Sequence, residues 1–232
     1  PADSTSALSS VPAAGNRRSI PMPGRLIYFH GPMDCGKSTL ALQINHNHAR
    51  QGRQGLILTR FDRSGAPTVT TRVGLTHDAI EVEDETDLRV LVRDEWARGR
   101  GVDYLIVDEA NFLEPTHVDQ LAELVDDWDV DVYCFGLLSD FRSQLFPGAK
   151  RLVELADEIV PVQVEVLCWC GRPGSKNARI VNGVVVREGD TVVVADTDPT
   201  ANASVHYQVL CRMHHRRGDV GPDGPDQLTL DL

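Results

Sequence analysis

Four residues near the start of the sequence have the types and spacing needed to bind the phosphates of a nucleotide. Gly31, Gly36, Lys37 and Ser38 fit the pattern G-x-x-x-x-G-K-[ST]. In such a loop, backbone N–H groups surround the phosphates, the lysine contacts the β and γ oxygens, and the hydroxyl contacts Mg²⁺. A glycine turn between a strand and a helix is the alternative without chemistry. The intervening positions, which would contribute mainly backbone N–H groups, are Pro32, Met33, Asp34 and Cys35.

Two of these intervening side chains are unusual beside an anion. Because the loop binds phosphates through its backbone, Asp34 can be accommodated if its carboxylate faces solvent or a neighbouring loop. Cys35 precedes a predicted helix N-terminus and lies near Lys37, and both features favour the thiolate. We therefore expect Cys35 to be alkylated faster than the other thiols, and bound ATP to protect it.

A pair of carboxylates, Asp108 and Glu109, follows the short apolar run YLIV. In phosphate-loop proteins the first acid typically meets Mg²⁺, and a second acid at this place can accept a proton from the attacking oxygen. Water as the attacking group would make the protein an ATPase, whereas a substrate hydroxyl would make it a kinase. Two solvated acids at the end of a strand are the alternative without chemistry.

Four late residues have the spacing of a zinc ribbon, which joins two short pairs of thiolate or imidazole ligands through β structure. The pairs are Cys168-x-Cys170 and Cys211-x-x-His214, and His215 is an alternative ligand to His214. A metal-free module with small buried cysteines is the other reading.

The elements that must position these groups alternate between short apolar runs and amphipathic segments. This alternation predicts an α/β fold with a mostly parallel sheet covered by helices, of the P-loop (RecA-like) type. The expected strands are 25–30, 55–60, 104–110 and 131–137, and the expected helices are 38–51, 86–98, 114–128 and 150–159.

The composition of the chain changes along its length. Residues 1–23 are rich in Ser, Ala and Pro and are expected to be disordered, and residues 24–161 form the expected nucleotide-binding domain. Residues 162–217 are expected to form a small β-rich zinc-ribbon domain, with a hairpin turn at Asn182-Gly183 and a strand at 191–196. The tail 218–232 is expected to be disordered.

The bulk properties exclude several classes of partner. A formal charge of −11 over 232 residues argues against non-specific binding to nucleic acid or to anionic lipid. The sequence contains no run of about 18 apolar residues, so no transmembrane helix is expected, and the first residues do not resemble a signal peptide. An odd number of unevenly placed cysteines, five, indicates reduced thiols and a cytoplasmic location.

Several motifs together resemble the zinc-containing type of thymidine kinase, which includes the cytosolic vertebrate enzyme and most bacterial ones. The matching segments extend from about Arg25 to Arg216. They are GPMDCGKST, VDEANFL, CFGLLSDFRSQLFPGAKRLVELAD and YQVLCRMHH. The resemblance implies ATP-dependent phosphorylation of the 5′-hydroxyl of thymidine, with deoxyuridine as a second substrate. It also implies a homotetramer and feedback inhibition by dTTP.

The resemblance also assigns roles to individual residues. Glu109 matches the family's general base. The Mg²⁺ and phosphate residues fall on Lys37, Ser38 and Asp108, with Ala110, Asn111 and Arg72 also at the nucleotide site. The thymidine-binding residues fall on Met33, Phe112, Leu137, Phe141, Phe146 and Tyr207, and a loop around Val194 would hold the edge of the base.

The sequence departs from the family pattern at five places, one of which is Leu138, where many relatives have Arg. Asp34-Cys35 replaces Phe-Ser in the phosphate loop, and Asn111 replaces Gln. The spacing of Cys168 and Cys170 is one residue shorter than usual. The loop after Val194 is longer and lacks its usual Gly-Gly.

Three other classes of protein share parts of this pattern. The Asp-Glu pair alone also permits a P-loop ATPase that moves nucleic acid or protein. The acidic charge, the short chain and the lack of a basic stripe argue against it. An inactive zinc-binding protein is a second alternative. The presence of Lys37, Ser38, Asp108 and Glu109 together argues against it. A nucleoside monophosphate kinase would need additional cations for the acceptor phosphate.

Overall fold

A six-stranded parallel sheet forms the centre of the computed structural model, which describes residues 24–60, 68–70, 74, 76–189 and 205–222. The strand order is β5-β2-β6-β7-β1-β8, and every pairing within this sheet is parallel. The sheet therefore confirms the predicted α/β class. The strands are β1 (Leu26–His30), β2 (Gly55–Thr59), β5 (Ile80–Glu81), β6 (Tyr104–Val107), β7 (Asp131–Gly136) and β8 (Glu158–Pro161).

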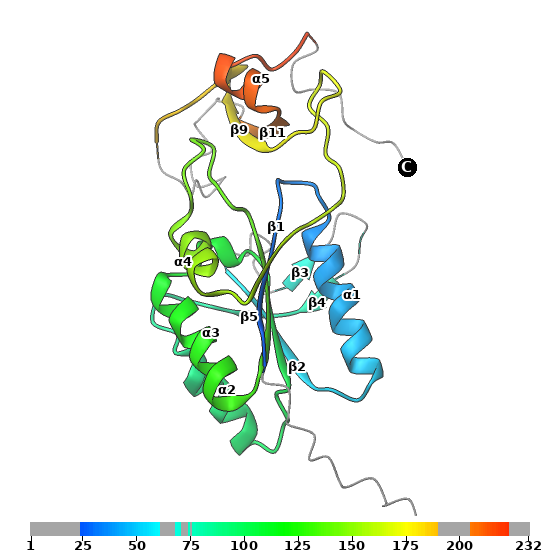
Figure 1. Cartoon of the computed structure of the whole chain (residues 1–232), viewed down its shortest axis with the longest axis vertical. Helices are drawn as coiled ribbons and strands as arrows, with labels where there is room; N and C mark the ends of the chain where they lie inside the picture. The colour runs from blue at the N-terminus through cyan, green and yellow to red at the C-terminus, as the bar shows by residue number, and fades with distance from the viewer. Residues whose placement is uncertain (1–23, 61–67, 71–73, 75, 190–204, 223–232) are drawn as a thin grey trace, which may run out of the picture.

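Helices cover both faces of this sheet (Figure 1). The central strands are mostly apolar, and alternate residues point to opposite faces. In β6, Leu105 and Val107 pack in one core, whereas Tyr104 and Ile106 pack in the other. One face is covered by α1 (Lys37–Arg50), and the other by α2 (Leu88–Ala97), α3 (Pro115–Trp128) and α4 (Pro147–Leu155).

The first residues of the helices explain where they begin. Asp87 accepts hydrogen bonds from the N–H groups of Arg89 and Val90, which caps α2. Pro115 and Pro147 are the first residues of α3 and α4, where the missing N–H costs no hydrogen bond. A short 3₁₀ helix, η1 (Ala110–Phe112), follows β6 directly.

A smaller β module lies beyond the carboxyl ends of the sheet strands, where the phosphate loop also lies (Figure 1). It contains β9 (Lys176–Val181), β10 (Val184–Val185), β11 (Val205–Leu210) and α5 (Arg212–Arg217), and β9 is the central strand. The predicted hairpin joins β9 to β10, and both turn residues, Asn182 and Gly183, have positive φ angles. A two-stranded pair, β3 (Thr68–Thr70) and β4 (Thr76–Asp78), completes the described strands.

Two expectations from the sequence are wrong at their boundaries. The helix expected at 150–159 ends at Leu155, because Glu158–Pro161 pairs with β1 as an edge strand of the sheet. The tail was expected to be disordered from residue 218, but Val220 packs on the core of the small module. The expected strand at 191–196 lies outside the described residues.

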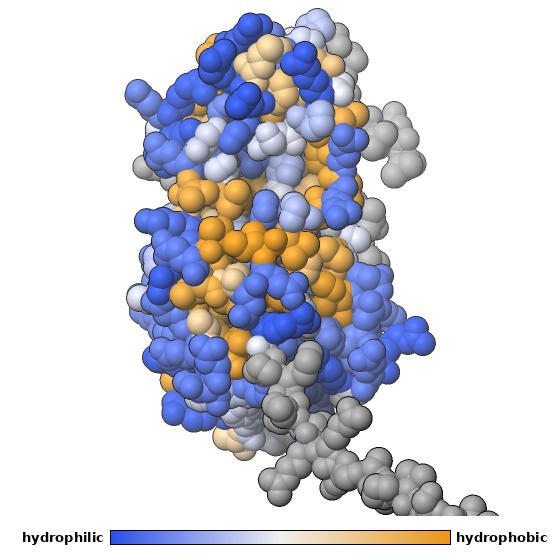
Figure 2. All heavy atoms as spheres, viewed as in Figure 1, coloured by the Kyte–Doolittle hydropathy of each residue, from blue (hydrophilic) through white to orange (hydrophobic). Residues whose placement is uncertain are grey.

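Apolar surface remains exposed near this edge of the sheet. Val153 on α4, Ile159 on β8 and Val164 in the following segment are 39%, 43% and 59% exposed. Figure 2 shows apolar side chains in a band across the middle of the molecule. Within the described part of the chain, no helix has both the length and the apolar composition to cross a membrane.

Candidate active site

The phosphate loop connects the end of β1 to the first turn of α1, as the sequence predicts. Gly36 has a φ angle of +79°, a left-handed conformation that L side chains rarely adopt. A Cβ atom at Gly31 would lie 2.4 Å from Sγ of Cys35, so a side chain there would displace the thiol. Both glycines of the motif are therefore required by the backbone and by packing.

Lys37 is folded back onto the loop that precedes it. Its Nζ donates to the carbonyl oxygen of Pro32 at 2.8 Å and to that of Gly31 at 3.3 Å, and the side chain is nearly buried. The loop thus already holds the ammonium group beside the space that its backbone encloses. A phosphate group entering there would meet a pre-oriented cation.

The two unusual loop residues face opposite directions. Asp34 is exposed, as expected, and its φ angle of 68° turns the backbone of the loop. Cys35 is fully buried, and its Sγ lies 3.8 Å from Nζ of Lys37. The expectation that Cys35 reacts fastest is therefore wrong, because the thiol packs under the loop against Gly31 and reagents cannot reach it.

Asp108 joins the end of β6 to the first turn of α1. Its Oδ2 accepts a hydrogen bond of 2.7 Å from Oγ of Ser38, and its Oδ1 accepts one of 3.0 Å from the N–H of Glu109. Burial raises the pKa of Asp108, which the hydrogen bonds from Ser38 and Glu109 and the charge of Lys37 partly oppose. A carboxylate and a hydroxyl in contact beside a phosphate loop fit the oxygen ligands that Mg²⁺ prefers.

Glu109 sits at the turn between β6 and η1. Its φ angle of 53° is left-handed, and its side chain is half-buried, so the strand ends abruptly with the carboxylate at the edge of the sheet. This edge also carries the phosphate loop, because the carboxyl ends of neighbouring parallel strands meet there. Glu109 therefore follows directly on Asp108, whose carboxylate contacts the first turn of α1.

The backbone of Leu137 is held from both sides beyond the end of β7. Its N–H donates to Oδ1 of Asn111 at 2.8 Å, and its carbonyl oxygen accepts from the hydroxyl of Tyr28 at 2.7 Å. Burial raises the pKa of Tyr28, with smaller contributions from the charges of Cys134 and Glu109, so its hydroxyl remains a donor. Nδ2 of Asn111 is buried without a hydrogen-bond partner.

The apolar residues assigned to thymidine form two groups. Phe112 and Phe146 meet edge to face at 5.2 Å between ring centroids, and Leu137 packs on the same core as they do. Phe141 lies apart from them and faces the small module. The guanidinium of Arg179 on β9 lies 3.9 Å from the centroid of its ring and donates from Nε to the hydroxyl of Tyr207 at 2.9 Å.

Further contacts fix the small module against the phosphate-loop domain. Oδ1 of Asn177 on β9 accepts a hydrogen bond of 2.9 Å from the N–H of Met33 in the loop. Nε2 of His215 donates to the carbonyl oxygen of Phe141 at 2.9 Å. Asp140, which is almost fully buried, accepts from the N–H groups of Arg142 and Gln144 and so shapes the turn that carries Phe141.

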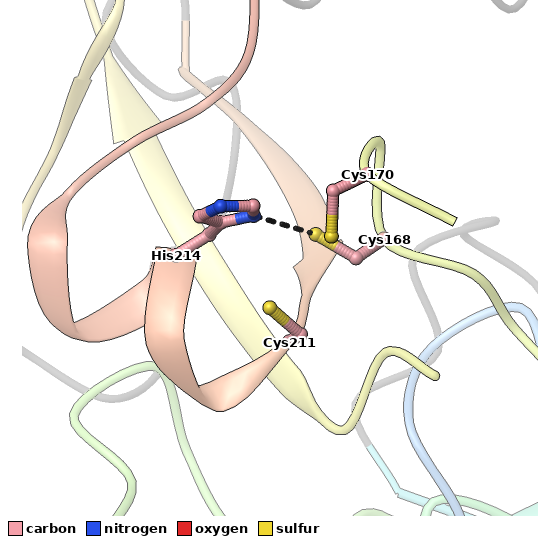
Figure 3. A group of neighbouring side chains, drawn as sticks. All are labelled: Cys168, Cys170, Cys211 and His214. Carbon is pink, nitrogen blue, oxygen red and sulfur yellow. Dashed lines mark hydrogen bonds between the residues drawn. The ribbon is translucent and has the colours of Figure 1, made fainter. Parts of the chain in front are cut away.

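The four predicted metal ligands come together in the small module (Figure 3). The ligand atoms of Cys168, Cys170, Cys211 and His214 all lie within 4.8 Å of one another. Zn–S bonds of about 2.3 Å give a tetrahedron with edges of about 3.8 Å, so this donor set fits zinc with a small contraction. Nδ1 of His214 points toward Sγ of Cys168 at 3.4 Å, whereas His215 contacts Phe141. His214 therefore belongs to the cluster and His215 does not.

Two of the predicted site residues, Arg72 and Val194, lie outside the described residues. Four residues at the site were missed by the sequence analysis: Tyr28, Asp140, Asn177 and Arg179. Asp140 had a local signal, because Asp favours turns in which its side chain accepts backbone N–H groups. The other three act through contacts with residues far away in the sequence, which no local pattern reveals.

A family model and sequence relatives identify one family. A family model described as thymidine kinase matches residues 24–215. A thymidine kinase of Streptomyces coelicolor is 56% identical over 192 residues, which cover 83% of this chain and 88% of the relative. A thymidine kinase of Cutibacterium acnes is 54% identical over 196 residues, which cover 84% of this chain and 90% of the relative.

Proposed function

The chain belongs to the thymidine kinase family and is a thymidine kinase, and on that basis we propose that it transfers the γ-phosphate of ATP to the 5′-hydroxyl of thymidine. Deoxyuridine is the second substrate that we propose. The observation that carries the proposal is the contact between Ser38 and Asp108, which joins the phosphate loop to the strand that ends in Glu109.

Phosphate binding rests on the loop and on Lys37. The backbone N–H groups of residues 35–38 face the β- and γ-phosphates, and Nζ of Lys37 moves from the carbonyl oxygens of Gly31 and Pro32 to the phosphate oxygens. Ser38 and Asp108 hold Mg²⁺, which supplies charge neutralisation at the phosphates when it is bound.

Glu109 acts as the general base in this proposal. Its carboxylate orients the 5′-hydroxyl of thymidine in line with the γ-phosphorus and accepts the hydroxyl proton as the new P–O bond forms. ADP leaves with the electrons of the broken P–O bond. Most of the rate acceleration comes from positioning and from electrostatic stabilisation.

Thymidine lies between the two groups of apolar residues. Phe112, Leu137 and Phe146 form one wall, and Phe141 with Tyr207 forms the other, with Met33 beside the thymine methyl group. Leu137 is suited to this role because Asn111 and Tyr28 hold its backbone. Closure around the nucleoside excludes water, which would otherwise be activated by Glu109.

The small module supports the site from the opposite side. Cys168, Cys170, Cys211 and His214 hold Zn²⁺, which supplies a structural crosslink between the start and the end of the module. Five free cysteines support a reducing, cytoplasmic location. A homotetramer and inhibition by dTTP complete the proposal, and both are carried over from the family resemblance alone.

The test is ATP consumption with and without thymidine, with the products identified by mass. The proposal expects ADP release that depends on thymidine and matches thymidine monophosphate one for one. ADP release that is indifferent to nucleosides would instead mean that Glu109 activates water. The same assay with deoxyuridine and with added dTTP tests the second substrate and the inhibitor.

A further inference from the structure

A groove on the small module carries three arginines that the proposed reaction does not use. It has a volume of about 540 Å³ and is lined by Arg172, Arg212, Met213 and Arg216. Arg172 follows the first pair of metal ligands in the sequence, and the other three residues lie on α5. Cavities of a few hundred Å³ are the size that small ligands occupy.

The three arginines line the same groove from two segments of the module. Arg212 and Arg216 are four residues apart on α5, so their side chains leave the same face of the helix. Arg172 reaches the same groove from the loop after Cys170. All three side chains are exposed, and among the described residues no hydrogen bond or ion pair involves any of the three guanidinium groups.

The charge of the surrounding module differs in sign from that of the whole chain. Residues 162–217 contain seven Lys and Arg and five Asp and Glu, whereas the complete chain has a formal charge of −11. A local excess of cations on an acidic protein gives a positive potential that attracts anions from solution.

The thiolates of the metal cluster are a source of negative charge in the same module. Three thiolates with one Zn²⁺ leave about one negative charge, so one neighbouring cation balances the cluster. Three arginines around one groove exceed that requirement. The excess is the reason to look for a ligand from solution.

We propose that this arginine groove binds a chain of phosphate groups, either free polyphosphate or the polyphosphate part of a nucleotide. Arginine presents a planar fork of N–H donors that matches phosphate oxygens in pairs, and several forks around one groove favour a ligand with adjacent negative charges. Met213 is partly buried against the core of the small module and is the apolar residue of the groove lining. The site is separate from the phosphate loop and would be a second anion site on the enzyme.

The test is calorimetric titration of the full-length, zinc-loaded protein with sodium tripolyphosphate at near-physiological salt. Because the phosphate loop also binds phosphates, the titration is done in a Lys37→Ala background. The proposal expects binding in this background and a loss of about tenfold or more in affinity with Arg212→Gln plus Arg216→Gln. Arg50→Gln plus Arg93→Gln is the matched control, since both arginines are exposed and lie on other helices.

Several outcomes would overturn the proposal. Affinity that is unchanged in the groove variant, or lowered equally in the control, would mean that tripolyphosphate responds only to net charge. Tighter binding of a glutamate-rich peptide than of tripolyphosphate would assign the groove to an acidic protein partner instead. Loss of zinc from the groove variant with unchanged anion binding would mean that the arginines serve only the thiolates.

Two further measurements keep the result interpretable. Zinc is quantified in every variant after titration, and if the double variant loses metal, the single variant Arg216→Gln decides the matter at full zinc content. Titration with ATP separates the two sources of the ligand. Tighter binding of ATP than of tripolyphosphate identifies a nucleotide, and equal binding identifies the phosphate chain alone.

Discussion

The guanidinium of Arg179 lies 3.9 Å from the ring centroid of Phe141 and also donates to the hydroxyl of Tyr207. One side chain thus joins two residues assigned to the thymidine site, from the sheet domain and from the small module. Because Arg179 is almost fully buried, its charge interacts with the aromatic ring with little screening by water.

We predict that Arg179→Met raises the KM for thymidine by about tenfold, with a smaller change in kcat, because Phe141 and Tyr207 lose their common partner. Steady-state kinetics with thymidine as the varied substrate measure this. Arg217→Met, at an exposed arginine on α5, is the control. An unchanged KM for Arg179→Met would show that the two aromatic residues hold their positions without it.

We predict that Glu109→Gln lowers kcat by about 10²- to 10⁴-fold and leaves the KM for thymidine nearly unchanged. The amide keeps the size of the side chain but cannot accept the hydroxyl proton. Thymidine-dependent ADP release measures the change. A kcat equal to that of the unmodified protein would remove Glu109 from the role of base.

We predict that Trp169→Leu weakens zinc binding by about tenfold, because the indole stacks on the ring of His214 at 4.3 Å between centroids and fixes its orientation. Trp169→Phe should retain most of the affinity, since a ring of similar thickness can stack in the same place. Competition with a coloured chelator measures zinc affinity directly. Equal affinities for the two variants would mean that the stack does not orient the ligand.

We predict that Cys170 is alkylated first when zinc is removed and that Cys35 reacts only after denaturation. Cys170 is the one described cysteine that is not buried, whereas Cys35 has no exposed surface. Mass spectrometry after brief labelling, with and without chelator, locates the modified thiols. Rapid labelling of Cys35 in the native protein would show that the phosphate loop opens.

We predict that the protein becomes less stable as the pH falls below about 6.5. Burial, followed by the charge of Arg53, lowers the pKa of His48. Burial is also the main reason that the pKa values of His30 and His215 are lowered. A histidine whose folded pKa is depressed binds a proton more readily when unfolded, so stability is lost as the pH falls through the unfolded pKa toward the folded one. Urea unfolding at several pH values between 5 and 8 measures this loss.

The matched variant for the pH dependence is His48→Gln. His48 contacts Tyr133 through Nε2 and Arg53 through Nδ1, and glutamine can make similar hydrogen bonds without titrating. The variant should therefore show a flatter dependence of the unfolding free energy on pH. The same slope in both proteins would assign the effect to other groups.

The sequence predicts those parts of the fold that depend on local pattern. The phosphate loop, Asp108-Glu109 and the hairpin at Asn182-Gly183 are determined by a few adjacent residues, and each lies where the pattern places it. The metal ligands were also predicted, although the short spacing of Cys168 and Cys170 departs from the usual one. Their clustering requires α5, which carries His214, to pack beside the segment that contains Cys168 and Cys170.

Features that depend on distant contacts could not be predicted in the same way. The segment after Leu155 continues a helical pattern, but Asp157 accepts a hydrogen bond from the N–H of Leu26, and Glu158–Pro161 pairs with β1 instead. Cys35 has charged neighbours in the sequence that suggest reactivity, yet packing against Gly31 buries it. In both cases tertiary packing outweighs the local signal.

The hydrogen bond between Met33 and Asn177 has a consequence for the energetics of the whole molecule. Asn177 lies on β9, whose neighbour β11 leads directly into Cys211, so the phosphate loop and the metal cluster share one mechanical connection. Thermodynamic linkage is reciprocal: if an ordered module helps the loop to bind phosphate, then bound phosphate must help the module to retain its metal. We therefore expect bound nucleotide to slow the loss of zinc from the metal cluster.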